Sequence, residues 1–295
     1  MNEAPRADSR DRHIGHLVIV GGNEDREQDR TVLRRFVQLT RREEPRIVLL
    51  TTGDADSRGA LPAYDRAFAS LGVRERATLV IDRREQANDP QVADRLLGAD
   101  GVFVATGDGR RLLALLGGTK AHEALHTGFE SLAQCVAGTG AAAAALAQHV
   151  LFEDPDSPVR AGPQPLAAGL GLVHRAVIDQ QFSERRRLAC LLGVVAQNPT
   201  LIGIGIDEDT ALVIEPDGGI EVVGDSAVTL VDGRQMSSSF LHSTGPPARE
   251  VQELVDVKLH LLPAGSRYET ASELPPVLQE IVGILVGAAS PGSNP

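Results

Sequence analysis

Aromatic residues are scarce in this chain. They make up 3% of its 295 residues, and tryptophan is absent, so the core has to be built from aliphatic side chains. Lysine is nearly absent too: Lys120 and Lys258 are the only two, and the other basic residues are arginines. The net charge is −11. A charge of this sign disfavours nucleic acid and anionic membrane surfaces as partners, because both repel a negatively charged protein.

Long hydrophobic runs are also missing. No stretch has the roughly 20 apolar residues of a transmembrane helix, and the charged start MNEAPRADSRDRH contains no apolar segment typical of a signal peptide. The only cysteines, Cys135 and Cys190, each lie in an apolar stretch. This usage is typical of reduced thiols in a core, so we expect a cytoplasmic protein without membrane association.

The sequence does contain a regular alternation of apolar runs and helical patterns. The runs that predict strands are residues 16–20, 46–52, 77–82, 101–105 and 173–179. They are apolar throughout, so we expect the strands to be covered on both faces. The order predicts an α/β fold with a doubly wound, mainly parallel sheet.

The pattern changes after residues 201–207. Short apolar segments separated by turn residues predict a C-terminal antiparallel β meander. No linker divides the chain, so we expect one domain over residues 14–286, with loose tails at 1–13 and 287–295.

The stretch VAGTGAAAAALAQHV, residues 136–150, predicts a strand, a sharp glycine turn and an alanine-rich helix. This is the frame of a nucleophile elbow, whose pattern is Gly-x-Ser-x-Gly. The middle position here is Gly140, which has no hydroxyl. An elbow serine sits in a strained backbone conformation, at a cost of about 1–3 kcal/mol for a non-glycine residue. We therefore expect the turn to be kept as architecture, with Gly140 relieving its strain.

The segment HEALH matches the His-Glu-x-x-His zinc pattern through His122, Glu123 and His126. Two histidines one helical turn apart need a third ligand, and the following TGFESL supplies none at the spacing of the longer zinc motif. We interpret the segment as a solvated helix face. A zinc protein remains an alternative.

Two further segments are predicted to reach the carboxyl edge of the sheet. VGGNEDRE, residues 20–27, predicts a tight turn there without the full phosphate-binding pattern. IDQQFSERRR, residues 178–187, ends one strand and opens a helix with Ser183 as its N-cap. Arg185 and Arg187 would then lie on the first helical turn, where the dipole disfavours basic residues. They are interpreted either as ligands for a carboxylate or as solvated side chains.

From LVIVGGNEDR, through GLGLVHRAVIDQQFSERRRLACLLGVVAQNPTLIGIGIDEDTALVI, to VDVKLHLLPAGSRYE, the chain resembles the cyanophycinase family. These serine peptidases release β-Asp-Arg dipeptides from the polymer cyanophycin. The resemblance covers about residues 14–270. It implies a class I glutamine-amidotransferase-like α/β fold, a homodimer and no cofactor.

The departures from this family fall where the chemistry should be. The family's Gly-Thr-Ser-Ala-Gly appears as Gly-Thr-Gly-Ala-Ala, with Gly140 in the serine position. The family's Asp-Gln-His-Phe appears as Asp-Gln-Gln-Phe, with Gln181 in the position of the general-base histidine. The acidic member of the triad is sought in EDPDSP, residues 153–158, without a secure match. No catalytic residue is therefore expected to be intact.

The resemblance also assigns binding residues. The family's Thr-Gly-Gly-Asp-Gln turn becomes Ala-Thr-Gly-Asp-Gly, which keeps Asp108 and puts Gly109 in place of a substrate-facing glutamine. Cys190 stands where the family has a third arginine. Positions that match the family's substrate site, or lie beside it at the strand end, are Asp108, Gly109, Asp179, Gln180, Arg185 and Arg187.

These observations predict a catalytically inactive cyanophycinase homologue. It would bind an Asp/Arg-containing peptide or another ligand with a carboxylate, as a homodimer or with an active homologue as partner. The main alternative is a hydrolase or other enzyme that acts through relocated residues, for which Thr139, Ser183 and Cys135 are the available nucleophiles.

Overall fold

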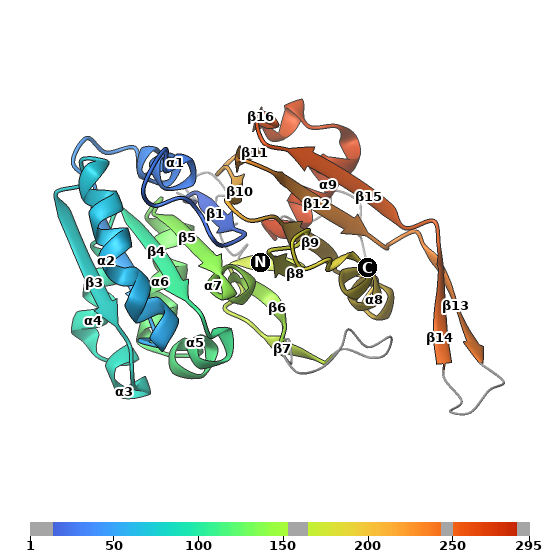
Figure 1. Ribbon diagram of the computed structural model, residues 1–295, viewed down its shortest axis with the longest axis horizontal. Helices are drawn as coiled ribbons and strands as arrows, with labels where there is room; N and C mark the ends of the chain where they lie inside the picture. The colour runs from blue at the N-terminus through green and yellow to red at the C-terminus, as the bar shows by residue number, and fades with distance from the viewer. Residues whose placement is uncertain (1–13, 153–164, 243–249, 288–295) are drawn as a thin grey trace, which may run out of the picture.

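The computed structural model describes residues 14–152, 165–242 and 250–287, which form a mixed α/β structure with two large sheets (Figure 1). The first sheet has eight strands, in the order β16 (Arg267–Thr270), β11 (Gly218–Gly224), β10 (Thr210–Ile214), β1 (Leu17–Val20), β5 (Cys135–Gly140), β4 (Gly101–Thr106), β2 (Arg46–Thr51) and β3 (Glu75–Val80). From β1 to β3 all neighbours are parallel, whereas β10, β11 and β16 are antiparallel additions.

The second sheet has six strands, in the order β15 (Lys258–Pro263), β12 (Ala227–Asp232), β9 (Ile202–Ile206), β8 (Val173–Gln180), β6 (Ala147–Leu151) and β7 (Leu166–Ala168). The α/β class predicted from the sequence is confirmed. The predicted meander is divided, because β10, β11 and β16 extend the first sheet while β12 and β15 extend the second. A separate ribbon of β13 (Ser237–His242) and β14 (Glu250–Val255) projects from the body in Figure 1.

Helices cover both faces of the first sheet, as its continuously apolar strands require. One face packs on α1 (Thr31–Leu39) and α2 (Ala55–Ser70), where Phe36, Phe68 and Phe103 contact one another. On the other face lie α3 (Arg84–Ala87), α4 (Pro90–Leu97), α5 (Gly109–Leu116) and α6 (Lys120–Ser131). With Tyr64, these residues account for four of the nine aromatic residues of the chain.

The largest core cluster joins the two sheets. It contains Ile19 and Val104 from the first sheet, Ile178 and Ile204 from the second, and Ala143 from the short helix α7 (Ala141–Leu146) between them. The helix α9 (Pro276–Leu285), which follows the 3-10 turn η1 (Ala271–Glu273), adds to the same core. The outer face of the second sheet is covered by α8 (Leu188–Gln197).

The start of α8 differs from the sequence prediction. Residues 182–186 form turns, Arg186 has a left-handed φ of 54°, and the helix begins only at Leu188. Ser183 is therefore not the N-cap; its backbone N–H donates to the Asp207 carboxylate instead. Arg185 lies before the helix and Arg187 is its N-cap residue, so neither arginine lies on the first helical turn.

No helix within the described residues is both long and apolar enough to cross a membrane. The two tails that were predicted to be loose lie almost entirely outside the described ranges.

Candidate active site

The turn between β5 and α7 has the backbone geometry of a nucleophile elbow. Gly140 ends β5 with φ 56° and ψ −124°, a combination that L-residues rarely adopt, and α7 begins at Ala141. A Cβ placed on Gly140 would have no heavy atom within 4 Å. The predicted strand and turn are confirmed, whereas the predicted helix ends at Leu146 because residues 147–150 belong to the strand β6. The missing side chain is not explained by crowding, since the space for it is open.

A cleft of about 390 Å³ lies around this turn, at the carboxyl ends of the parallel strands where α/β proteins bind ligands. We call it the elbow cleft. Loops after β1, β4 and β8 meet here with α2 and the elbow itself. Its lining includes Gly22, Asn23, Glu24, Arg26, Asp56, Tyr64, Thr106, Gly107, Thr139, Gly140, Ala141, Gln180, Gln181 and Arg185.

Gln181 lies next to the elbow and is held by a carboxylate. Its backbone is left-handed, with φ 49°, and its Nε2 donates to Glu208 Oε1 at 2.5 Å. Asn23 Nδ2 donates to the same oxygen at 2.6 Å. An acid that holds the neighbour of a nucleophile is the arrangement of a catalytic triad. Glu208 thus stands where the acid of a triad would stand, although neither a serine nor a histidine is present.

Glu208 was missed by the sequence analysis, which sought the acid in residues 153–158. That segment lies outside the described residues. A signal was available, because Asp207, Glu208 and Asp209 lie at the end of the apolar run that forms β9 (Ile202–Ile206), the parallel neighbour of β8, which Gln181 follows.

A second carboxylate lies buried in the wall of the cleft. Glu24 is 3% exposed, and burial raises its pKa above the ordinary value. Thr139 Oγ1 donates to Glu24 Oε2 at 2.6 Å, and the Tyr64 hydroxyl donates to Glu24 Oε1. Glu24 therefore ties together the loop after β1, the strand β5 and the helix α2.

None of the three residues named as relocated nucleophiles has the environment of one. Thr139 is buried and its hydroxyl is engaged by Glu24. Cys135 is fully buried, and this burial raises the pKa of its thiol, which disfavours the reactive thiolate. Ser183 lies in the turns after β8 and does not line the elbow cleft.

Only some of the residues predicted to bind substrate line the elbow cleft. Gln180 and Arg185 line the elbow cleft. Arg187 and Asp179 do not: Arg187 is 6% exposed, and its Nε lies 3.0 Å from Asp179 Oδ2 in a buried ion pair. Arg187 therefore uses its charge inside the fold, in the pair with Asp179.

Asp108 and Gly109 lie at the turn between β4 and α5, and Cys190 stands where the family has a third arginine. These residues have structural roles. The Asp108 side chain caps α5 by accepting the Arg111 N–H at 3.0 Å. A Cβ placed on Gly109 would lie 3.2 Å from the Ala141 carbonyl oxygen, so little room is left there for a longer side chain. Cys190 is buried in α8. None of Asp108, Gly109 and Cys190 lines the elbow cleft.

The HEALH segment forms part of α6 and serves as a support. His122 Nε2 and His126 Nε2 lie 2.8 and 2.7 Å from the same acceptor, the Leu170 carbonyl oxygen. Glu123 is exposed. The described ranges contain no group of three or more residues arranged to hold a metal ion. The interpretation as a solvated face was correct for Glu123 but incomplete for the two histidines, which hold the segment before β8.

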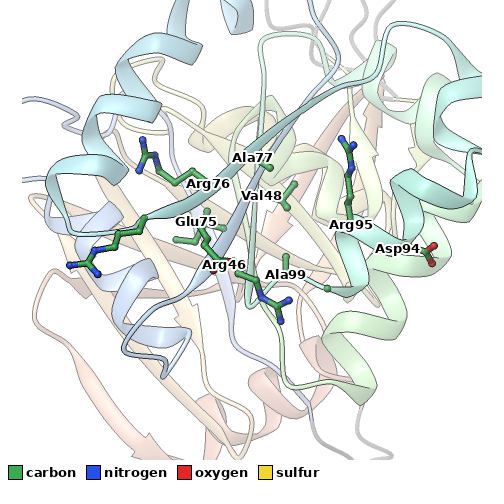
Figure 2. A pocket seen from close by; sticks show the side chains of 11 residues that line it. Arg46, Val48, Glu75, Arg76, Ala77, Asp94, Arg95 and Ala99 are labelled. Carbon is green, nitrogen blue, oxygen red and sulfur yellow. The ribbon is translucent and has the colours of Figure 1, made fainter.

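A larger hollow, of about 540 Å³, lies at the opposite end of the first sheet (Figure 2). Its rim is rich in arginine, but Figure 2 shows Arg46, Arg76 and Arg95 pointing in different directions. Arg76 Nε lies 3.0 Å from an Asp65 oxygen, and Arg46 Nε lies 3.6 Å from an Asp100 oxygen. Because charges at this amino end of the strands are partly compensated and do not converge, the elbow cleft is the better candidate site.

Comparisons with known proteins identify the family of this chain. The profile of Peptidase family S51 matches residues 17–222. A cyanophycinase from Trichormus variabilis is 32% identical over 254 residues, which cover 85% of this chain and 84% of the relative. A cyanophycinase from Geminocystis herdmanii is 30% identical over 261 residues, 88% of this chain and 95% of the relative.

The fold is shared with a solved structure, the crystal structure of a peptidase from an acI-B1 Actinobacterium. Its TM-score is 0.65 at 21% sequence identity, and the match covers 86% of this chain and 96% of that chain. The mainly parallel first sheet, with helices on both faces, is that of a class I glutamine-amidotransferase-like fold. With a family profile that spans most of the chain and cyanophycinase relatives of nearly full length, the chain belongs to peptidase family S51.

Proposed function

We propose that this chain is a peptide-binding member of the S51 family that lacks serine-peptidase activity. The observation that carries the proposal is at the elbow. Its backbone keeps the geometry that presents a nucleophile, yet Gly140 supplies no hydroxyl and Gln181 supplies no imidazole. Serine attack needs both the hydroxyl and a base that takes its proton. The cleft around the elbow nevertheless remains open, so it is still able to bind a ligand.

The charges on the cleft walls indicate the kind of ligand. Arg26 and Arg185 supply cations, and Asp56 supplies a carboxylate on the α2 side. Within the described part of the chain, Asp56 has no ion pair. A ligand that carries both a carboxylate and a cation matches these walls. An Asp/Arg-containing peptide, such as the β-Asp-Arg unit of cyanophycin, has this chemistry, and its carboxylate would dock at Arg185.

We also propose that the protein works in the cytoplasm, as a homodimer or together with an active homologue. The two cysteines, which the structure contains as buried thiols, support a reducing compartment. The homodimer and the active partner rest on the family resemblance.

The test uses purified protein and insoluble cyanophycin. We expect the protein to co-sediment with the polymer without releasing β-Asp-Arg above a buffer blank, since no hydroxyl is present at residue 140. An active cyanophycinase from the same preparation procedure serves as the positive control for release. Dipeptide release that disappears on substitution of a cleft residue would overturn the proposed inactivity, and failure to co-sediment would overturn the proposed ligand.

A further inference from the structure

The place of the missing triad is occupied by two side-chain amides fixed on one carboxylate oxygen. Asn23 Nδ2 and Gln181 Nε2 both donate to Glu208 Oε1, at 2.6 and 2.5 Å. Both amides line the elbow cleft. Gly22 lies on the same wall. A Cβ placed on it would lie 3.4 Å from the Gly140 Cα and 3.8 Å from the Gln181 Cγ. The amides therefore border the open space above the elbow.

Each of these amides has hydrogen-bonding capacity left over. A side-chain amide has two N–H donors and a carbonyl oxygen that accepts. Within the described residues, Asn23 and Gln181 each use one N–H of the side chain, and neither amide oxygen accepts a hydrogen bond. Together they offer donors and acceptors side by side, which is the pattern that complements another amide.

The charge next to the two amides is that of the Glu208 carboxylate to which both donate, and it is negative, whereas Arg185 supplies a cation to the same cleft. Glu208 has no ion pair with a basic residue in the part of the chain that the structure describes. A second carboxylate is close, because Glu184 Oε1 lies 3.3 Å from the Glu208 backbone nitrogen. A ligand carboxylate placed above Gly140 would meet this negative charge, whereas a neutral amide would not, and like charges brought together are disfavoured.

We propose that Asn23, Gln181 and Glu208 form a subsite for a neutral amide, so that the elbow cleft binds an uncleaved peptide bond in preference to the free carboxylate produced by its hydrolysis. This rests on the proposed function for the identity of the whole ligand, but not for the chemistry of the subsite. The change from histidine to glutamine would then have a role of its own. It removes a base and supplies a group that binds the bond that an active relative would cut.

The test compares two small probes of nearly equal shape, acetamide and acetate. The protein is titrated with each probe at pH 7, and the side-chain NH₂ resonances of Asn23 and Gln181 are followed by NMR. We expect acetamide to shift both pairs of resonances, and acetate to bind at least about fivefold more weakly because of its charge. Equal responses to the two probes, a stronger response to acetate, or no response to either would overturn the subsite.

Two variants separate the subsite from a general charge effect. Glu208→Gln keeps the shape and one acceptor oxygen but removes the charge, so the preference for acetamide should fall below about twofold. Glu75→Gln removes one exposed charge at the far end of the first sheet and should leave the preference unchanged. A Glu208→Gln protein that keeps the full preference would contradict the electrostatic argument.

A second experiment, which measures peptide binding, distinguishes this inference from the proposed function. Calorimetry compares a dimer of two β-Asp-Arg units, which contains the backbone bond that an active relative would cut, with β-Asp-Arg dipeptide, the product of that cut. Acetamide preference without binding of either peptide would retain the subsite and reject the proposed ligand. Binding of the peptides without acetamide preference would retain the proposed ligand and reject the subsite. We expect both the acetamide preference and tighter binding of the dimer than of the dipeptide.

Discussion

At the scale of single residues, glycine suits the elbow better than the serine of an active enzyme. Gly140 has φ 56° and ψ −124°, where a Cβ strains the backbone. The space around that Cβ is empty, so a serine would fit without displacing a neighbour. The cost of restoring it is therefore confined to the backbone, at about 1–3 kcal/mol.

The first prediction concerns repair of the triad. Gly140→Ser alone and Gln181→His alone should not react with a fluorophosphonate probe, because one lacks a base and the other lacks a nucleophile. The pair Gly140→Ser with Gln181→His should label weakly, since Glu208 is already placed to hold residue 181. Triad members act as a unit, so the effects should be far from additive. Strong labelling of Gly140→Ser alone would show that another base is present.

The second prediction separates the two arginines. Arg187→Ala breaks the buried ion pair with Asp179 by removing one of its two charges, and should lower the free energy of unfolding by about 3–5 kcal/mol. Arg185→Ala should leave stability within about 0.5 kcal/mol, as is usual for exposed side chains, while weakening peptide binding. Urea unfolding measures the first effect and calorimetry with β-Asp-Arg the second. Unchanged affinity in Arg185→Ala would mean that this arginine is a solvated side chain.

At the scale of helices, strands and loops, the sequence predicts what local pattern and strand order determine. The elbow at residues 135–146 follows from an apolar strand, a glycine and an alanine run, and it is present. The start of α8 does not follow from local pattern. Serine is a residue type that often caps helices. Here, however, the Ser183 N–H donates to the distant Asp207, Arg186 has a left-handed backbone, and the helix begins only at Leu188.

Glu208, the acid of the site, also depends on contacts that local sequence pattern does not predict. Glu208 approaches Gln181 only because β8 and β9 are parallel neighbours that end at one edge of the second sheet. The end of an apolar run places Glu208 at a strand end, but it does not show the contact with Gln181, which lies 27 positions away in the sequence. Likewise, the use of Arg187 within the fold depends on the packing of α8 and was not visible in the residues themselves.

The third prediction concerns Glu24, which links three elements. Because desolvation raises its pKa in the folded state, its contribution to stability is fully present below its ordinary pKa of 4.5 and is lost as the pH rises through the raised value. Glu24→Gln removes this dependence. The free energy of unfolding of Glu24→Gln relative to wild type should therefore increase between pH 4 and pH 8, as measured by urea titration at each pH.

A matched control is Glu123→Gln, which neutralises an exposed glutamate on α6. Its stability relative to wild type should stay constant over the same pH range. A relative stability of Glu24→Gln that is constant or falls with pH would contradict the assignment of Glu24 as a carboxyl group whose pKa is raised by burial.

At the scale of the whole molecule, the two sheets are connected by a core that neither could complete alone. The largest apolar cluster takes residues from both sheets, and α7 lies where they meet, between β5 of the first and β6 of the second. Ala142, Ala143 and Ala145 in this helix are fully buried. Small side chains let α7 pack closely, so the alanine run shapes the junction as well as the elbow.

The last prediction follows from this shared core. Ala143→Leu should overpack the junction and lower the free energy of unfolding by about 1–3 kcal/mol or more. The thermal transition should move to lower temperature but remain single, with equal calorimetric and van't Hoff enthalpies, because the loss of one sheet exposes the core of the other. Ala69→Leu, at an exposed position of α2, is the control and should leave the transition nearly unchanged. Two separate transitions in either protein would mean that the sheets unfold independently and that the single domain predicted over residues 14–286 is in fact two.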